Sequence, residues 1–125
     1  MTQLIRSYRD LLAWQEAMTL AEDVYRLVAS LPANERFELS AQLRRAAVSI
    51  PSNIAEGYAR DSAASYAHFL RIARGSLREV ETQVLLAERL KLIEEAMNNA
   101  VLSRCDRVGK LLHGLLRSVE RTAQT

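Results

Sequence analysis

The chain has 125 residues and a mass of 14.1 kDa, so we expect a single domain that spans residues 1–125. Apolar residues make up 49% and charged residues 26%, which excludes an intrinsically disordered protein. Seventeen Lys and Arg against fifteen Asp and Glu leave a net charge of only +2. Four glycines and two prolines are too few for the many turns of an all-β sandwich or barrel, so we expect an all-α fold.

The chain has little of the chemistry that marks membrane, secreted or metal proteins. No apolar run approaches the ~18–20 residues of a membrane span, and the stretch from Met1 to Asp10 lacks the basic-then-apolar order of a signal peptide, so we expect a cytoplasmic protein. The single Cys105 has no partner for an internal disulfide, and one cysteine with two histidines, His68 and His113, is too few residues to favour a metal site. Without a Gly-rich phosphate loop or a nucleophile beside a visible base, we expect no cofactor and no enzyme activity.

The first helix is predicted from Tyr8 to Leu31. Ser7 followed by Asp10 resembles a capping box, and Leu31 precedes a proline that ends the segment. Apolar residues recur at three- and four-residue steps, as in a bundle helix, at Trp14, Ala17, Ala21, Val24, Val28 and Leu31.

The second helix is predicted to be capped by Asn34 and to end between Gly57 and Arg60. Pro51 lies inside it and removes one backbone hydrogen bond, so we expect a kink there rather than an end, because the apolar period continues beyond it. That stripe consists of Leu39, Leu43, Ala46, Ile50, Ile54 and Tyr58.

The third helix is predicted to be capped by Ser62 and to run to about Leu92. Its interior Gly75 costs ~1 kcal/mol relative to alanine, which favours a close approach of another helix at that point. The fourth helix is predicted from roughly Glu94 to Val119. Cys105 is predicted to be a small core residue on its apolar stripe, which consists of Met97, Val101, Cys105, Val108, Leu112 and Leu115. Short connections make sequential helices antiparallel, so the sequence predicts an up-down four-helix bundle.

The second and third helices carry more apolar surface than one bundle core needs. Beside its core stripe the second helix has another arc nearly free of charge, and the third helix has apolar residues on a neighbouring arc. We expect these surplus residues to form an interface between copies of the chain, although a wide core boundary would explain them too. The interface residues are Phe37, Ala41, Val48, Ala55, Ile72, Leu86 and Leu90.

A polar arc separates the two apolar arcs of the second helix. Spacing suggests a ladder between this arc and Ser76, Glu79 and Gln83 of the third helix. The carboxylates of Glu56 and Glu79 could indicate acid–base catalysis, but we favour a structural role in which Arg45 and Arg78 neutralise them. The ladder residues are Arg45, Ser49, Asn53, Glu56, Ser76 and Glu79.

Three stretches resemble one known family. They are YRDLLAWQEAM from Tyr8, QLRRAAVSIPSNIAEG from Gln42 and FLRIARGSLREVETQ from Phe69. Together they resemble the four-helix bundle proteins encoded in intervening sequences of bacterial 23S ribosomal RNA, also labelled S23-like ribosomal proteins. The resemblance covers about Tyr8 to Leu92 and implies an antiparallel four-helix bundle that assembles as a ring-like homopentamer. It does not imply an enzyme. The related accessory variability determinant of diversity-generating retroelements looks similar in fold and works with a reverse transcriptase and its nucleic acid, an analogy of fold that does not fix function.

Basic residues gather on the fourth helix. From Ala96 to Thr125 five basic residues stand against two acidic ones, and most of the basic ones lie opposite the apolar stripe. Arg71, Arg74 and Arg78 form a second row on the third helix, where acidic neighbours weaken the field. The candidate nucleic-acid-binding residues are Arg104, Arg107, Lys110, Arg117 and Arg121.

Two functions follow from this pattern. If the chain forms a ring, the basic row is repeated in every subunit and makes a positive band. Each patch of this band adds to a salt-dependent affinity for the phosphates of RNA or DNA. The first function is therefore an oligomeric adaptor for nucleic acid. A face that carries arginine only for solubility explains the same row, and the second function is therefore a scaffold that binds a protein partner and no nucleic acid.

Overall fold

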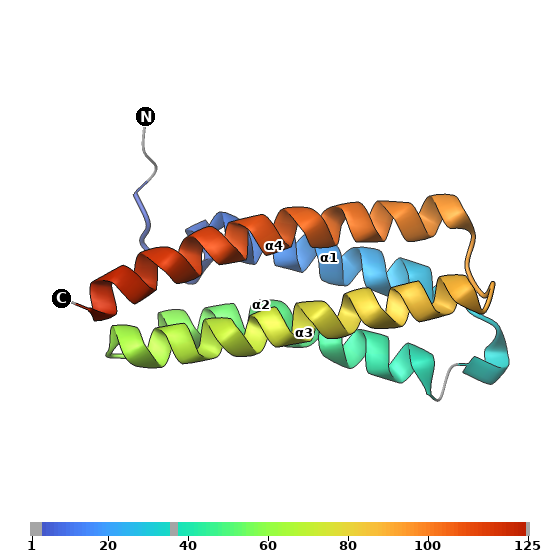
Figure 1. Cartoon of the computed structure of the whole chain (residues 1–125), viewed down its shortest axis with the longest axis horizontal. Coiled ribbons are helices and arrows are strands. Elements are labelled where there is room, and N and C mark those ends of the chain that lie inside the picture. The colour runs from blue at the N-terminus through green and yellow to red at the C-terminus, as the bar shows by residue number, and fades with distance from the viewer. Residues whose placement is uncertain (1–3, 36–37, 125) are drawn as a thin grey trace.

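The computed structural model describes residues 4–35 and 38–124, where the chain is helical throughout its regular elements. Sequential helices run antiparallel, and neighbours in the chain pack side by side, with α4 closing the bundle against α1 (Figure 1). The predicted all-α antiparallel up-down four-helix bundle is confirmed. In chain order the elements are η1 (Tyr8–Asp10), α1 (Leu12–Ala29), η2 (Ala33–Glu35), α2 (Leu39–Tyr58), α3 (Ala63–Arg89) and α4 (Glu95–Ala123).

The predicted capping box is confirmed, but it caps a short 3₁₀ helix instead of the long α-helix. The backbone N–H of Arg9 donates to Ser7 Oγ at 2.9 Å, and the backbone N–H of Ser7 donates to Asp10 Oδ2 at 3.1 Å. Leu11 then has an extended backbone, so α1 begins at Leu12. The first predicted helix is therefore two elements.

The second helix begins later than predicted. Asn34 lies within η2, and α2 begins at Leu39, so the prediction that Asn34 caps this helix is wrong. Pro51 lies inside α2 and is buried, and the helix continues through it to Tyr58. Loss of one hydrogen bond at Pro51 does not end the helix, because the flanking turns still pack on the core.

Both ends of α3 carry an identifiable capping motif. The backbone N–H of Ser65 donates to Ser62 Oγ at 3.1 Å, which confirms the predicted cap. At the other end Lys91 has a φ of 57°, in the left-handed region, and the backbone N–H of Leu92 donates to the carbonyl of Ala87 at 3.0 Å. This pattern is a Schellman motif that ends the helix with a lysine where glycine is usual.

One continuous apolar core lies between the four helices, and the predicted stripe residues of all four contribute to it except Met97, which is 37% exposed. Cys105 is fully buried in it, as predicted, and burial raises the pKa of its thiol to about 12. No helix in the described residues is long and apolar enough to cross a membrane.

The close helix approach predicted at Gly75 is found at Gly57 instead. Gly75 is exposed, and a Cβ built there would meet no atom within 4 Å, so the prediction is wrong. A Cβ on Gly57 would lie 2.9 Å from Phe69 Cβ and 3.0 Å from Tyr66 Cδ1, closer than side chains tolerate. Gly57 therefore lets the end of α2 pack closely against α3.

Candidate functional site

The predicted basic row of α4 divides into two parts, and the first part is turned toward α1. Arg104 contacts Glu16 at 3.0 Å and Asp23 at 3.2 Å, and Arg107 contacts Glu16 at 2.6 Å. The hydrogen bond to Glu16 is the largest of the effects that raise the pKa of Arg104. Partial desolvation raises the pKa of the Glu16 carboxyl, but hydrogen bonds from Arg107 and Arg104 outweigh it and hold the pKa below its ordinary value. These two arginines therefore tie α4 to α1.

The second part of the row faces away from α1. Lys110 lies 3.3 Å from Asp106, one turn earlier in α4, and its side chain is 80% exposed. Arg117 and Arg121 are exposed and form no ion pair within residues 4–35 and 38–124. An ion pair this exposed is weak, so Lys110 adds to the positive field with Arg117 and Arg121.

A groove of about 360 Å³ lies between α3 and α4, and Lys110 lines it together with the carboxylates of Glu81 and Asp106. Arg74 of α3 and His113 of α4 line it, and Arg74 forms no ion pair in the described part of the chain. Its neighbours in the predicted α3 row are neutralised, because Arg71 contacts Glu120 at 2.7 Å and Arg78 contacts a carboxylate of its own helix. The positive face of the molecule thus combines Arg74 with the second part of the α4 row.

The polar ladder between α2 and α3 is present, with fewer members than predicted. The hydroxyls of Ser49 and Ser76 are 2.8 Å apart, and Asn53 Nδ2 donates to the carbonyl of Ser49 at 2.8 Å and to its Oγ at 2.9 Å. Next to this cluster, Gln83 Nε2 donates to Gln42 Oε1 at 3.4 Å. These bonds fix how α2 and α3 face each other.

The charged members of the predicted ladder behave differently. Glu56 points to Arg60 of its own helix at 3.5 Å, so its place in the ladder is wrong. Arg45 and Glu79 line the same groove of about 350 Å³ as the two serines, but neither forms an ion pair with any described residue. Arg78, the other predicted neutralising residue, pairs with Glu81 at 2.6 Å. Glu56 and Arg78 thus pair within their own helices, because residues three or four positions apart on a helix are neighbours.

The two carboxylates considered for catalysis do not share a site, since Glu56 is engaged by Arg60 and Glu79 lies in the groove between α2 and α3. No group of three or more His, Cys, Asp and Glu side chains able to hold a metal ion occurs in the part of the chain that the structure describes. His68 and His113 are both exposed.

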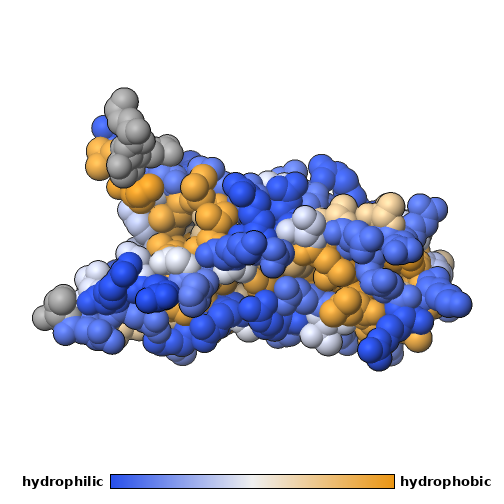
Figure 2. Space-filling model, turned by 45° about the horizontal axis from the view of Figure 1, so that its top comes forward, coloured by the Kyte–Doolittle hydropathy of each residue, from blue (hydrophilic) through white to orange (hydrophobic). Residues whose placement is uncertain are grey.

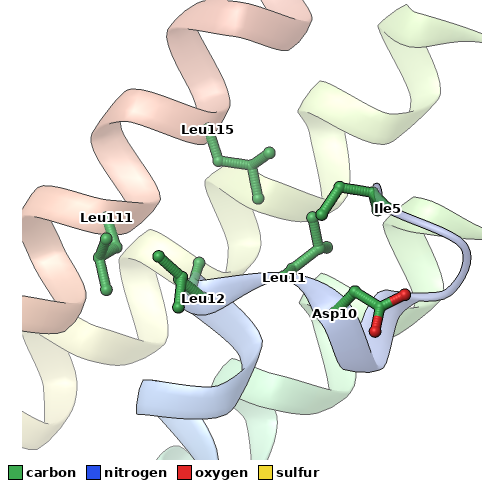
Figure 3. Close-up of a pocket in the computed structure, with 7 residues that line it drawn as sticks. Ile5, Asp10, Leu11, Leu12, Leu111 and Leu115 are labelled. Carbon is green, nitrogen blue, oxygen red and sulfur yellow. The ribbon is translucent and has the colours of Figure 1, made fainter. Parts of the chain in front are cut away.

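A hollow of about 300 Å³ lies where the N-terminal segment meets α1 and α4 (Figure 3). Ile5 and Leu11 approach it from one side and Leu111 and Leu115 from α4. The acidic side chain at its edge, Asp10, is occupied as a helix cap, because it accepts backbone hydrogen bonds there. Figure 2 shows an apolar area at this end of a face that is otherwise mostly hydrophilic.

Four of the seven predicted interface residues are exposed in the single chain, and the described members of the set lie on two surfaces. Val48 is 42% exposed, and with Ala55 and the buried Pro51 it lines a groove of about 540 Å³ between α1 and α2. Ala41 and Ala55 are half-buried, and Phe37 lies outside the described residues. The second surface is on α3, where Ile72, Leu86 and Leu90 are 39%, 46% and 56% exposed.

The α1 side of the groove was missing from the sequence prediction. Trp14, Met18 and Tyr25 line it, and Met18 and Tyr25 are 39% and 49% exposed. Their spacing of four and seven residues places them on one flank of the helix, next to the core stripe. This signal is present in the sequence and is the same kind of surplus arc that was recognised in α2.

Comparison with known proteins agrees with this architecture. Residues 9–114 match the sequence profile of the family described as 23S rRNA-intervening sequence protein. The chain belongs to this family. A crystal structure of a protein with unknown function from the S23 ribosomal protein family of Bacteroides thetaiotaomicron has a similar fold, with a TM-score of 0.79 and 23% sequence identity over 85% of this chain and 96% of that one. At that identity the likeness shows the fold alone. A comparison with curated proteins finds no match.

The stretch from Gln42 to Gly57, on which the resemblance to the 23S rRNA-intervening sequence protein family was first based, serves three contacts in this member. Ser49 forms the polar cluster with α3, Pro51 lines the apolar groove with α1, and Gly57 allows the close approach of α3. One short segment thus shapes the contacts of α2 with both α1 and α3.

Proposed function

We propose that this chain is a non-enzymatic adaptor that self-associates and binds RNA or DNA through the outward cations of α4. The observation that carries the proposal is that Arg117 and Arg121 form no ion pair among the described residues, beside the 80% exposed Lys110. An arginine that is not held by a carboxylate can donate two parallel hydrogen bonds to a phosphate. Arg104 and Arg107 would first have to leave Glu16, so we assign them to the stability of the bundle.

Self-association is supported by the two exposed apolar surfaces, one in the α1/α2 groove and one on α3. The family resemblance supports a homopentamer. A ring would repeat the three outward cations in every subunit, and several weak patches then bind one nucleic acid more tightly than a single patch. Light scattering on a size-exclusion peak tests this step, and a stable monomer at micromolar concentration would overturn it.

A salt titration tests nucleic-acid binding directly. We expect a fluorescently labelled single-stranded RNA of mixed sequence to bind at low ionic strength, with an affinity that falls by a slope of about 0.7 in log–log form for each phosphate contacted. The variant Arg117→Gln/Arg121→Gln should lower this slope, while the matched control Arg6→Gln/Arg26→Gln, which removes the same charge from exposed positions near α1, should leave it unchanged. No detectable binding of the unaltered protein at low salt, or equal losses in the two variants, would refute the proposal.

A scaffold that binds only protein is the second candidate. It is favoured by the ion pairs of Arg104 and Arg107 with Glu16, because they neutralise two of the five predicted cations within the chain. It predicts that a partner protein stays bound during purification after nuclease treatment, and that the RNA titration above gives no signal.

A further inference from the structure

Two contacts fix how α3 and α4 lie side by side. Arg71 of α3 contacts Glu120 of α4 at 2.7 Å, and Asn98 of α4 donates a hydrogen bond to Glu88 of α3. The helices run antiparallel, so the residues between these two contacts face one another in reverse order (Figure 1). The first half of α3 therefore lies beside the second half of α4, and the groove of about 360 Å³ between the helices extends into this part of the bundle.

The charged residues of this groove are sorted along its length. Glu81 and Asp106 line one end, and Arg74 and His113 line the other end, nearer the C-terminus of α4. Lys110 lies between the two ends. Arg74 and His113 are exposed, and Arg74 forms no ion pair with any residue of the described chain. The end lined by Arg74 and His113, called the basic end below, thus lies apart from the carboxylates of the groove.

Gly109 leaves room between the two helices. It lies inside α4, where glycine weakens a helix relative to alanine, and it lines the groove. A Cβ built there would lie 3.5 Å from Leu77 Cδ2, which is an ordinary contact, so the packing of the bundle does not require a glycine. A larger side chain would occupy part of the groove. Glycine at this position therefore favours entry of a ligand group between α3 and α4.

The basic end continues into the outward cations of α4. His113 follows Lys110 by three residues, and Arg117 and Arg121 follow at steps of four, so these four side chains lie along one side of the helix. From Lys110 to Arg121 this row is about 16 Å long at ~1.5 Å per residue. A row of this length suits successive phosphates of one nucleic-acid strand better than a single small anion.

We propose that one strand of a bound nucleic acid runs along this row and places a phosphate group at the basic end, between Arg74 and His113. This inference rests on the nucleic-acid binding proposed above, and it adds two contact residues, one of them on another helix. Arg74 can donate two parallel hydrogen bonds to the phosphate oxygens. Because Arg74 belongs to α3, the strand contacts both helices at this point and its position along α4 is fixed.

His113 makes this contact depend on pH. Histidine is the side-chain type that ordinarily gains a proton within the physiological pH range, and an imidazolium donates a charge-assisted hydrogen bond to a phosphate oxygen. The affinity should therefore rise as pH falls. The other titratable and charged groups around His113 are Arg74, Arg78 and Glu81 of α3 and Asp106, Lys110 and Arg117 of α4. Replacement of His113 alone separates its contribution from theirs.

The salt titration with labelled single-stranded RNA tests the role of Arg74. We expect Arg74→Gln to lower the log–log slope by about 0.7, which corresponds to one phosphate contact with a single strand. The matched control is Arg89→Gln, because Arg89 is an exposed arginine of the same helix without an ion pair in the described part of the chain, and it lies far from the groove. This control should leave the slope unchanged.

A pH series at constant ionic strength tests the role of His113. Between about pH 8 and pH 5.5 we expect the affinity of the unaltered protein to rise about fivefold, the effect of one exposed ionic contact. His113→Gln should remove this rise. His68→Gln is the matched control, since His68 is an exposed histidine of α3 that does not line the groove, and this variant should keep the rise. Circular dichroism at each pH shows that the variants stay folded.

The outcomes separate this inference from the proposed function. RNA binding that weakens in Arg117→Gln/Arg121→Gln but is equal in Arg74→Gln and Arg89→Gln overturns the strand placement and leaves the proposed function standing. A pH dependence that persists in His113→Gln does the same. Displacement of RNA by inorganic phosphate at constant ionic strength, if it is lost in Arg74→Gln, would assign the basic end to a free anion and overturn the placement. No RNA binding at low salt overturns both.

Discussion

Replacement of Gly57 by alanine tests how closely α2 packs on α3. The new Cβ would lie 2.9 Å from Phe69 Cβ, 3.0 Å from Tyr66 Cδ1 and 3.2 Å from the carbonyl oxygen of Tyr66, whereas ordinary contacts of a Cβ fall between 3.4 and 4 Å. Phe69 Cβ and the Tyr66 carbonyl are fixed by the backbone of α3, so rotation of a side chain cannot relieve these contacts. The two helices must move apart by several tenths of an ångström.

Two opposing effects set the size of the change. Forcing an extra methyl group into a packed contact costs about 1–3 kcal/mol, and the separation of α2 from α3 also strains the polar cluster of Ser49 and Ser76 nearby on the same two helices. Alanine is a better helix former than glycine by up to ~1 kcal/mol, but Gly57 is next to the last residue of α2, where this gain is smaller. We expect Gly57→Ala to lower the free energy of unfolding by about 1–2 kcal/mol.

Urea unfolding followed by far-ultraviolet circular dichroism measures this change, with Gly114→Ala as the matched control. Gly114 lies inside α4 with no atom within 4 Å of a built Cβ, so the same substitution there should raise stability by up to ~1 kcal/mol. Both variants are measured at several protein concentrations, so that any change in self-association is separated from the stability of the bundle. If Gly57→Ala stabilises the protein as much as Gly114→Ala does, the close packing of α2 on α3 is refuted.

Three further predictions concern single side chains. Tyr66 Oη is buried without a hydrogen bond to any described residue, and burial raises the pKa of Tyr66 to about 12. Tyr66→Phe should therefore raise the free energy of unfolding by about 1 kcal/mol. A decrease of that size in urea unfolding would show that the hydroxyl has a hydrogen-bond partner. Lys91 is in the left-handed region, so Lys91→Gly should raise stability by about 1 kcal/mol, and a lower melting temperature would contradict the Schellman motif. Desolvation raises the pKa of Glu16, but hydrogen bonds from Arg107 and Arg104 more than offset it and hold this pKa below its ordinary value. The stabilisation that ionised Glu16 gives to the folded protein is therefore present above the pKa of Glu16 in the unfolded chain and is lost as pH falls through its folded-state pKa. Glu16→Gln should therefore cost about 1 kcal/mol at pH 7 and progressively less as pH falls through the folded-state pKa of Glu16, and a difference that is independent of pH would exclude this linkage.

Much of the fold followed from local patterns in the sequence. The cap at Ser62, the position of Pro51 inside α2 and the place of Cys105 in the core all depend on residues a few positions away along one helix, and all three predictions are confirmed. Local patterns failed where a helix start was ambiguous: Asn34 is a good capping residue, but the chain uses it in a short 3₁₀ helix.

The candidate site was predicted in part. Position on a helical wheel identified Val48 and Leu86 as surplus apolar residues and Arg117 as an outward cation. The wheel gives the direction of a side chain about its own helix axis, but it does not say which other helix lies in that direction or at what distance. It therefore placed Arg107 with Arg117 in a single row.

Tertiary packing decided the rest. Arg104 and Arg107 bind Glu16, which lies 88 and 91 residues earlier in the chain, and this pairing removes them from the free cations. The close contact between helices that requires a glycine is at Gly57 and not at Gly75, because only the packing of α2 against α3 determines where the two backbones meet. The sequence by itself determined four amphipathic helices and their order, since periodicity is a local property. Partners and distances between helices depend on how those helices are rotated against one another, and that was decided by the tertiary structure.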